Sequence, residues 1–179
     1  MLVLVVGPSG AGKDTLINAA KSALAGDERY VFPRRVVTRH AIASLEDPDS
    51  VTPEDFALRA ANGAYALSGE ALGLRYGLPA SIRDDIAAGR VVVMNGSRAI
   101  VDAARETFPG TVVILVDASA DVRAQRLAGR GRESAAEVAA RLAREAPADI
   151  PNAIRVDNSG AVAEGISRFL TALRALPRN

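Results

Sequence analysis

The chain has 179 residues, of which 49% are hydrophobic and 24% are charged, and its formal net charge is +1. This length fits one domain with a sizeable apolar core, and the balanced charge indicates no nucleic-acid partner. The absence of cysteine excludes disulfides and thiolate metal sites and is typical of a reducing cytoplasm, where we expect the protein to reside. The apolar start, Leu2–Val6, is too short for a signal peptide or a membrane span, so we expect no membrane partner.

Short apolar runs predict the strands of a sheet. Three runs are continuous enough to be buried on both faces, namely Leu2–Val6, Val91–Met94 and Val112–Val116. Two shorter runs, Arg35–Thr38 and Ala153–Val156, are expected to join them in the same sheet. Helical patterns alternate with these runs. The alternation favours an α/β fold with a five-stranded parallel sheet and helices on both faces.

Capping signals mark where the helices begin. One helix is expected to start near Lys13, directly after the first strand, and Thr52 is expected to cap another. Pro79 is expected to open a further helix, because proline suits the first helical position. Ser119 and Ser134 are expected at the caps of two later helices.

The alternation of strands and helices fails between residues 39 and 78. This stretch contains a helical pattern near 53–62 and a hairpin pattern through 65–67 and 74–76. We therefore expect a small insertion at about 39–78 on the α/β core. It would belong to a single domain that spans residues 1–179.

The residues after the first strand have the spacing of a phosphate-binding loop. Strand, glycine-rich turn and helix start bring successive backbone N–H groups together around an anion, and the glycines let the backbone approach it. Lys13 adds a mobile cation for the outer phosphates. The loop departs from the usual pattern in one respect, because Asp14 follows the lysine and the hydroxyl of Thr15 comes one residue late. The expected nucleotide-binding residues of this loop are Gly7, Pro8, Ser9, Gly10, Ala11, Gly12, Lys13, Asp14 and Thr15.

Four stretches carry a resemblance to a known family. They read GPSGAGKDT at 7–15, RRVVTR at 34–39, NGSRA at 95–99 and RLAGRGRESAAEVAARLARE at 126–145, and DNSG at 157–160 is a shorter fifth match. In this order, over essentially the whole chain, they resemble the ribose 1,5-bisphosphate phosphokinases of phosphonate catabolism. These enzymes belong to the guanylate kinase-like branch of P-loop kinases.

The resemblance implies an activity and the residues that carry it. ATP with Mg²⁺ would be the donor and ribose 1,5-bisphosphate, a small phosphorylated sugar, the acceptor, with 5-phosphoribosyl 1-diphosphate and ADP as products. A phosphate acceptor is already ionised at neutral pH, so catalysis needs positioning and charge neutralisation rather than a general base. The residues implied in acceptor binding are Arg35, Arg39, Glu70, Tyr76, Asn95, Ser97 and Arg98. Those implied in ATP binding or catalysis beyond the loop are Arg126, Arg130, Arg141 and Asn158. The resemblance further implies that the insertion at about 39–78 binds the acceptor and that residues at about 129–136 form a short lid.

The magnesium ligand is expected to have moved along the chain. In related kinases the strand before the NGSR stretch ends in an acid that supports the metal, whereas this strand ends in Asn95. An amide does not supply the missing negative charge. We therefore expect the carboxylate of Asp14 to hold Mg²⁺, with the hydroxyl of Thr15 as a partner.

Three departures from the family pattern leave the identity of the acceptor open. They are Pro48, Gly69 and Leu72, all in the acceptor segment, where the family leads us to expect other side chains. A nucleoside monophosphate kinase of the guanylate type stays an alternative, as does a non-catalytic guanylate kinase-like binding module. His40 is interpreted either as a solvated loop histidine or as a contact to the acceptor phosphate. The oligomeric state also stays open, with a homodimer as one option.

Overall fold

The computed structural model describes residues 1–38, 50–71, 73–129 and 149–177. The chain forms two compact units. The first contains Met1–Leu4 and Ala25–Val112, and the second contains Val5–Leu24 and Val113–Asn179. The expectation of a single domain over residues 1–179 stays a prediction.

The main sheet has five parallel strands in the order β2-β7-β1-β8-β9. Their bounds are Leu2–Val6 for β1, Tyr30–Val31 for β2, Val91–Asn95 for β7, Val112–Asp117 for β8 and Ile154–Asp157 for β9. Every residue of β1 is buried, as are the first four residues of β7 and the middle four of β8. Because a parallel sheet is covered on both faces, its strands are apolar throughout rather than alternating. The predicted α/β class with a five-stranded parallel sheet is confirmed.

One strand of this sheet differs from the prediction. The prediction that Arg35–Thr38 joins the parallel sheet is wrong, because β3, Val36–Thr38, pairs antiparallel with β6 in a second sheet. The corresponding place in the parallel sheet belongs to β2, which pairs with β7 through Tyr30 and Val31. A strand of two residues carries no periodic pattern, so the sequence did not reveal it.

The second sheet lies entirely in the first unit and has the order β4-β3-β6-β5. Its other strands are β4 at Ser50–Val51, β5 at Tyr65–Ala71 and β6 at Leu74–Pro79. Helix α2, Pro53–Ala61, packs against it by stacking Phe56 on Tyr65 with 4.6 Å between the ring centroids. The Thr52 hydroxyl accepts a hydrogen bond from the Asp55 backbone N–H at 3.1 Å. The predicted hairpin, helix and Thr52 cap are confirmed.

Two further helices of the first unit follow this sheet. Helix α3, Ile82–Ala87, begins after Ser81, so the prediction that Pro79 opens a helix is wrong. Pro79 instead ends β6, where a residue without a backbone N–H is tolerated because the strand goes no further. A 3-10 turn at Arg98–Ile100 then leads into α4, Val101–Thr107.

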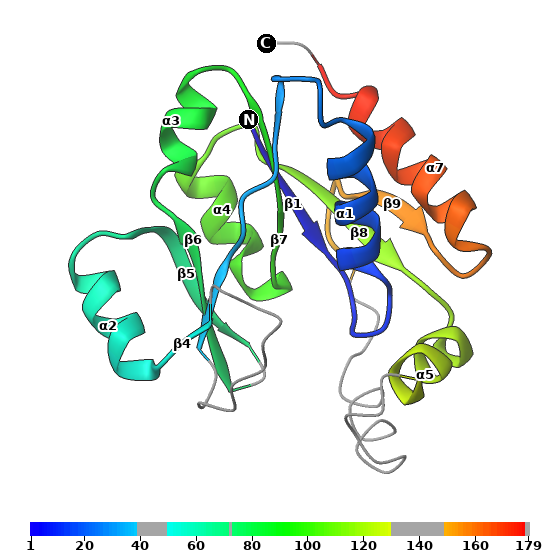
Figure 1. The fold of residues 1–179 in the computed structure, drawn as a ribbon, viewed down its shortest axis with the longest axis horizontal. Helices are drawn as coiled ribbons and strands as arrows, with labels where there is room; N and C mark the ends of the chain where they lie inside the picture. Colours follow the sequence, from blue (N-terminus) through cyan, green and yellow to red (C-terminus); the bar gives the residue numbers. More distant parts are fainter. Residues whose placement is uncertain (39–49, 72, 130–148, 178–179) are drawn as a thin grey trace. The chain divides into compact units, whose positions relative to one another are not determined.

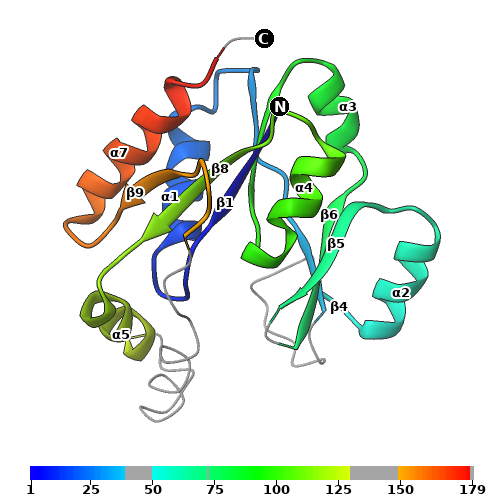
Figure 2. The same cartoon turned by 180° about the vertical axis from the view of Figure 1, so that it is seen from behind.

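The helices of the second unit are α1 at Lys13–Ala23, α5 at Ala120–Ala128 and α7 at Val162–Arg174. Helices α1 (blue) and α7 (red) run side by side in both views of the ribbon (Figures 1 and 2). Leu16 of α1 and Phe169 and Leu173 of α7 are fully buried. The predicted cap at Ser119 is confirmed, since its hydroxyl accepts from the Val122 backbone N–H. The cap predicted at Ser134 lies outside the described residues.

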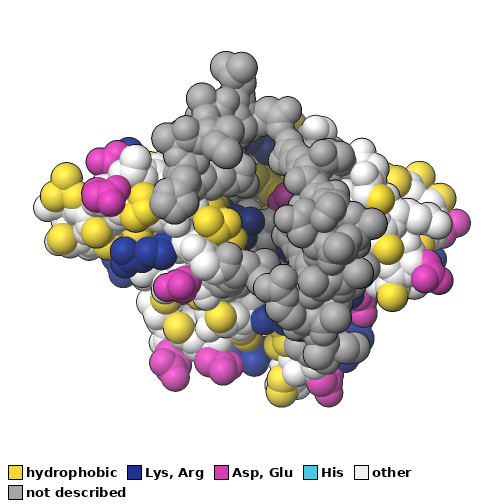
Figure 3. All heavy atoms as spheres, turned by 90° about the horizontal axis from the view of Figure 1, so that it is seen from below, with side chains coloured by type: hydrophobic (Ala, Val, Ile, Leu, Met, Phe, Trp, Pro, Cys, Tyr) yellow, Lys and Arg dark blue, Asp and Glu magenta, His cyan; other side chains and the backbone are white. Residues whose placement is uncertain are grey.

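The surface agrees with the small net charge. Basic side chains (dark blue) and acidic ones (magenta) both occur among apolar ones on the described part of the face in Figure 3. Within the same part of the chain, the structure contains no helix with the length and apolar character needed to cross a bilayer.

Candidate active site

The loop between β1 and α1 has the backbone form that an anion site requires. Gly12 precedes the helix, and its φ of 91° lies in the left-handed region, which glycine enters without steric cost. Gly10 has a φ of 80°, and a Cβ atom there would lie 2.8 Å from the carbonyl oxygen of Arg123. The first turn of a helix exposes backbone N–H groups that have no partner within the helix, and it carries the positive end of the helix dipole. An anion is stabilised at such a place.

Lys13 lies across this loop. Its Nζ donates hydrogen bonds to the carbonyl oxygens of Gly7, at 2.7 Å, and Pro8, at 3.0 Å. Gly7 in turn packs so closely on β8 that a Cβ atom there would lie 2.0 Å from the carbonyl oxygen of Val116. The loop therefore combines a cation with a backbone that the sheet holds in place.

Asp14 and Thr15 lie in the first turn of α1, and both are exposed. Mg²⁺ prefers oxygen ligands, keeps several waters and needs only one or two protein oxygens when substrate phosphates supply others. A carboxylate and a hydroxyl therefore fit this ion by type and number. Within the described ranges, no three His, Cys, Asp or Glu side chains are grouped closely enough to hold a metal ion. A metal at Asp14 would thus depend on the nucleotide's phosphates as well.

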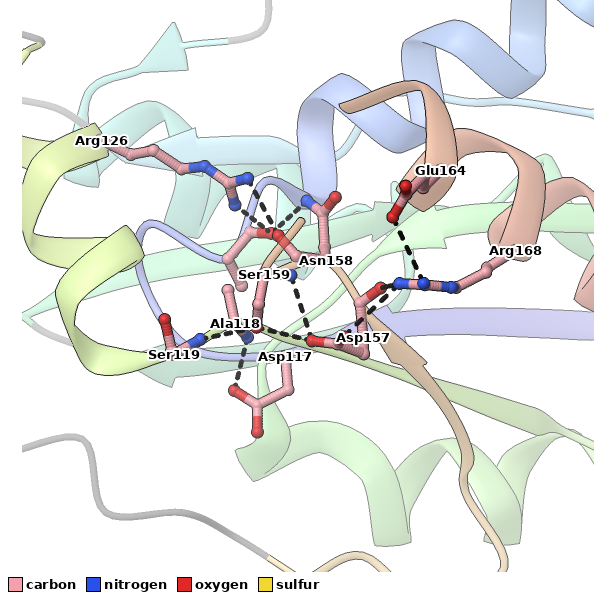
Figure 4. A network of polar contacts seen from close by, with 10 residues as sticks. Asp117, Ala118, Ser119, Arg126, Asp157, Asn158, Ser159, Glu164 and Arg168 are labelled. Atoms are coloured by element: carbon pink, nitrogen blue, oxygen red, sulfur yellow. Dashed lines mark hydrogen bonds and ion pairs between the residues drawn. The ribbon is translucent and has the colours of Figure 1, made fainter. Parts of the chain in front are cut away.

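Arg126 and Asn158 meet at the backbone of the same loop (Figure 4). Asn158 is 3% exposed, and its Nδ2 donates a hydrogen bond of 2.7 Å to the Ala11 carbonyl oxygen. The guanidinium of Arg126 donates to the Asn158 carbonyl oxygen at 2.9 Å and to the Ala11 carbonyl oxygen at 3.4 Å. Both residues were predicted from the sequence as ATP contacts, and this stays a prediction. Their contact with the loop was not anticipated, because it joins residues more than a hundred positions apart.

The turn that carries Asn158 is held by a network around Asp157 (Figure 4). One carboxylate oxygen of Asp157 accepts from the Ser159 hydroxyl at 2.6 Å and from the Ser159 backbone N–H at 3.1 Å. These two hydrogen bonds hold the pKa of Asp157 below its ordinary value. Arg168 also donates to the Asp157 carbonyl oxygen at 2.9 Å. The Ser159 hydroxyl accepts from the Ser119 backbone N–H at 3.0 Å, which ties this turn to the start of α5.

The first unit holds the described acceptor residues of the second sheet. The guanidinium carbon of Arg35 lies 4.6 Å from the centroid of the Tyr76 ring, a cation–π contact between two half-buried side chains. Tyr76 pairs across the sheet with Val37 and Gly69, whereas Glu70 is exposed on β5 and pairs with Arg75. Arg35 directly precedes β3, which belongs to the second sheet and not to the parallel one.

Asn95, Ser97 and Arg98 follow one another where β7 ends and the 3-10 turn begins. All three are half-buried. The Ser97 hydroxyl oxygen is buried and has no hydrogen-bond partner among the described residues. The turn is packed tightly, since a Cβ atom on Gly96 would lie 2.4 Å from Cδ1 of Leu4. The structure thus brings these three predicted residues together on one short turn.

Ile100 ends the same turn and is a residue that sequence reasoning missed. A Cβ atom built on Gly69 of β5 would lie 2.4 Å from Cγ2 of Ile100, so glycine is the residue that lets the hairpin approach this turn. The sequence held one signal of this contact, because a glycine inside a strand often marks a close approach. It did not identify the partner.

Several predicted residues lie outside the described part of the chain. They are Arg39, His40, Pro48, Leu72, Arg130 and Arg141, together with most of the predicted lid.

Comparisons with curated proteins reveal relatives that match most of the chain. A ribose 1,5-bisphosphate phosphokinase of Brucella melitensis is 47% identical over 97% of this chain and 92% of its own length. The enzyme of the same name from Methylobacterium radiotolerans is 47% identical over 97% of both chains. That of Rhodopseudomonas palustris is 52% identical over 82% of this chain and 75% of its own. The chain matches no family model.

Comparisons with solved structures identify the fold. A guanylate kinase from Anaplasma phagocytophilum superposes with a TM-score of 0.67 at 22% identity, over 97% of this chain and 85% of its own. A gluconokinase from Sinorhizobium meliloti superposes with a TM-score of 0.54 at 21% identity, over 96% of this chain and 90% of its own. At these identities the likeness shows a shared kinase fold and does not identify a substrate.

Proposed function

The chain belongs to the ribose 1,5-bisphosphate phosphokinase family, and on this premise we propose that it transfers the γ-phosphoryl group of ATP to ribose 1,5-bisphosphate. The products are 5-phosphoribosyl 1-diphosphate and ADP. A new bond forms between an oxygen of the acceptor's 1-phosphate and the γ-phosphorus. The bond from that phosphorus to the β,γ-bridging oxygen breaks, and ADP leaves with this oxygen.

The observation that carries the proposal is the loop of Gly7–Gly12 with Lys13 bonded across it. Its glycines leave room for a triphosphate beside the backbone, and its helix start favours negative charge. When phosphates enter, the Lys13 ammonium exchanges backbone carbonyls for phosphate oxygens. In this role Lys13 stabilises the charge that spreads over the transferring group.

The acceptor needs no general base, because its phosphate is ionised at neutral pH. Binding and orientation are then the main tasks of the acceptor residues. We assign the phosphate contacts to Arg35 and Arg39, and to the hydroxyl of Tyr76, whose ring lies under the Arg35 guanidinium. Asn95, Ser97 and Arg98 would hold the sugar and its second phosphate, with Glu70 at the rim. Their polar side chains on one short turn support this assignment.

Asp14 and Thr15 would hold Mg²⁺ together with the nucleotide phosphates. When bound, the ion supplies positive charge to the β- and γ-phosphate oxygens. Arg130 and Arg141 are proposed as further cations at the transferring group.

The test is ADP release by the purified protein with MgATP and one of three acceptors, ribose 1,5-bisphosphate, GMP or AMP. We expect kcat/KM to be highest with ribose 1,5-bisphosphate. Higher activity with GMP would identify a guanylate-type kinase. MgATP binding without any acceptor-dependent ADP release would contradict a kinase for all three.

A further inference from the structure

We infer that Asn158 is a positioning residue that holds the phosphate-binding loop through the Ala11–Gly12 peptide. Its side chain does not contact the nucleotide base. Arg126 is a second support of the same peptide. This inference rests on the proposed use of ATP. Its central observation is the 2.7 Å hydrogen bond from Asn158 Nδ2 to the Ala11 carbonyl oxygen.

The geometry of the peptide turns this hydrogen bond into a constraint on the loop. The bond between Ala11 and Gly12 is trans, since the structure contains no cis peptide bond among its described residues. In a planar trans peptide the carbonyl oxygen and the amide hydrogen point in opposite directions. An Ala11 carbonyl that is fixed toward Asn158 and Arg126 therefore directs the Gly12 N–H away from them, to the other side of the loop.

The Asn158 amide has no room to turn. A Cβ atom on Gly12 would lie 2.5 Å from its Nδ2, and a Cβ atom on Gly165 of α7 would lie 2.0 Å from its Oδ1. The two glycines thus leave a slot that the amide fills between the loop and the helix. A carbonyl only accepts hydrogen bonds, so the nitrogen end has to face Ala11.

The oxygen end of the amide is equally informative. Asn158 Oδ1 is buried and has no hydrogen-bond partner among the described residues. A buried acceptor without a partner is costly, so the arrangement persists because the other end and the packing hold it. An amide that is 3% exposed and packed at both ends does not present a free edge to an adenine ring.

The support of the loop is built from the chain's own residues. The Asn158 backbone N–H donates to the Asp117 carbonyl oxygen at 2.8 Å, which continues the pairing of β8 and β9. The guanidinium of Arg126 donates to the carbonyl oxygens of both Asn158 and Ala11. The position of Asn158 is therefore set by the sheet, by α5 and by α7, and the loop is held against it by the chain's own residues.

A ligand that has phosphates but no nucleotide base distinguishes positioning of the loop by Asn158 from contact of Asn158 with adenine. If the amide positions the loop, Asn158→Ala should weaken binding of MgATP and of magnesium tripolyphosphate by the same factor, about tenfold for one lost buried hydrogen bond. If the amide contacts adenine, binding of MgATP weakens and binding of tripolyphosphate is unchanged. Both affinities are measured by isothermal titration calorimetry.

Two further variants complete the design. Gly165→Ala keeps the Asn158 amide, but the new methyl group would clash with the amide oxygen. This variant should therefore also weaken binding of MgATP and of tripolyphosphate by the same factor. Arg155→Ala is the matched control, because Arg155 lies on β9 in an exposed ion pair with Asp149, and both affinities should stay unchanged.

Each outcome leads to a decision. Equal losses in Asn158→Ala and Gly165→Ala support positioning, whereas wild-type affinities in a folded Asn158→Ala protein overturn it. If Asn158→Ala does not fold, Gly165→Ala decides, since it disturbs the oxygen end of the amide and removes no side chain. A wild-type protein that binds neither ligand would contradict the proposed kinase function instead.

Discussion

Gly69 of β5 lies directly against Ile100, so closely that a Cβ atom at position 69 would come within 2.4 Å of the Ile100 Cγ2. The next nearest atom of that side chain, Cβ, would be 3.9 Å away, an ordinary contact. One methyl group therefore sets how near the hairpin with Glu70 and Tyr76 comes to the turn with Asn95, Ser97 and Arg98. All of these residues belong to the first unit.

This contact predicts a rescue between two substitutions. Gly69→Ala should raise the KM for ribose 1,5-bisphosphate about tenfold, since overpacking of this kind costs about 1–3 kcal/mol. The affinity for MgATP should not change. Ile100→Ala removes the methyl group that would clash with a Cβ atom at position 69. The KM of the double variant should therefore return toward the wild-type value, although each single change raises it. Steady-state kinetics of the four proteins give the coupling free energy directly.

The control for this pair is Gly26→Ala, because a Cβ atom at Gly26 meets nothing within 4 Å. Its kinetics should match those of the wild type. Strictly additive effects of Gly69→Ala and Ile100→Ala on the acceptor KM would contradict a spacing role for the contact.

Lys13 offers a second prediction, with a matched lysine in the same helix. Lys13→Ala should lower kcat about a hundredfold to a thousandfold, because one preorganised charge at the transferring group is lost. Lys21→Ala changes an exposed lysine in the last turn of α1 and should leave kcat unchanged. Circular dichroism should show both variants folded. If the turnover of Lys13→Ala stays within a few-fold of the wild type, the proposed role of this loop in phosphoryl transfer is wrong.

The sequence predicted this loop well because all of its information is local. A strand, three glycines, a lysine and a helix start lie within a dozen consecutive residues, and each has a fixed conformational meaning. The buried strands were predicted equally well, since a continuous apolar run such as Val91–Met94 is typical of a strand that is buried on both faces of a parallel sheet.

The contacts that were missed join distant segments. The hydrogen bond from Asn158 to Ala11 spans 147 positions, and neither residue type signals the other. The contact of Gly69 with Ile100 and that of Arg35 with Tyr76 are of the same kind. The prediction of which sheet a strand joins failed where the apolar run was short. Strand β3 has only three residues, and its pairing with β6 determines its sheet.

The Arg35 contact leads to a third prediction. Arg35→Ala should raise the KM for ribose 1,5-bisphosphate by about tenfold and leave the MgATP dissociation constant unchanged, since it removes a phosphate contact and the support of the Tyr76 ring. Arg29→Ala is the matched control, because Arg29 lies over the ring of Tyr30 in a similar contact at 5.1 Å. A loss of MgATP binding in Arg35→Ala would refute the acceptor assignment.

Asp157 allows a prediction about pH. Hydrogen bonds from Ser159 hold the pKa of the folded Asp157 below its ordinary value of 3.8, so the folded state favours the charged carboxylate. This contribution to stability is complete above the unfolded pKa and is lost as the pH falls through the folded pKa. The stability difference between wild type and Ser159→Ala should therefore be constant near neutral pH and shrink below about pH 4. Urea unfolding at a series of pH values measures it, and the same comparison in an Asp157→Asn background should show no such shrinkage.

The last prediction concerns the exposed carboxylate of Asp14. If it holds Mg²⁺, Asp14→Asn should raise the magnesium concentration needed for half-maximal activity and lower kcat about tenfold to a thousandfold. The rival interpretation makes Asp14 a first-turn acid that only stabilises the helix dipole, worth about 0.3–1 kcal/mol. Asp121→Asn changes an exposed acid in the first turn of α5 and isolates that effect. Under the rival interpretation both variants lose a little thermal stability and keep the wild-type magnesium requirement.

A second acid then tests whether the metal charge has moved along the chain. Asn95→Asp restores the acid that related kinases carry at the end of this strand. If that acid and Asp14 can serve the metal interchangeably, the combination with Asp14→Asn should recover part of the lost activity. Rescue of this kind is a non-additive effect that a double-mutant cycle measures. Magnesium titrations of the wild type, both single variants and the double variant decide the question, and additive changes in kcat would mean that Asp14 does not replace the strand acid.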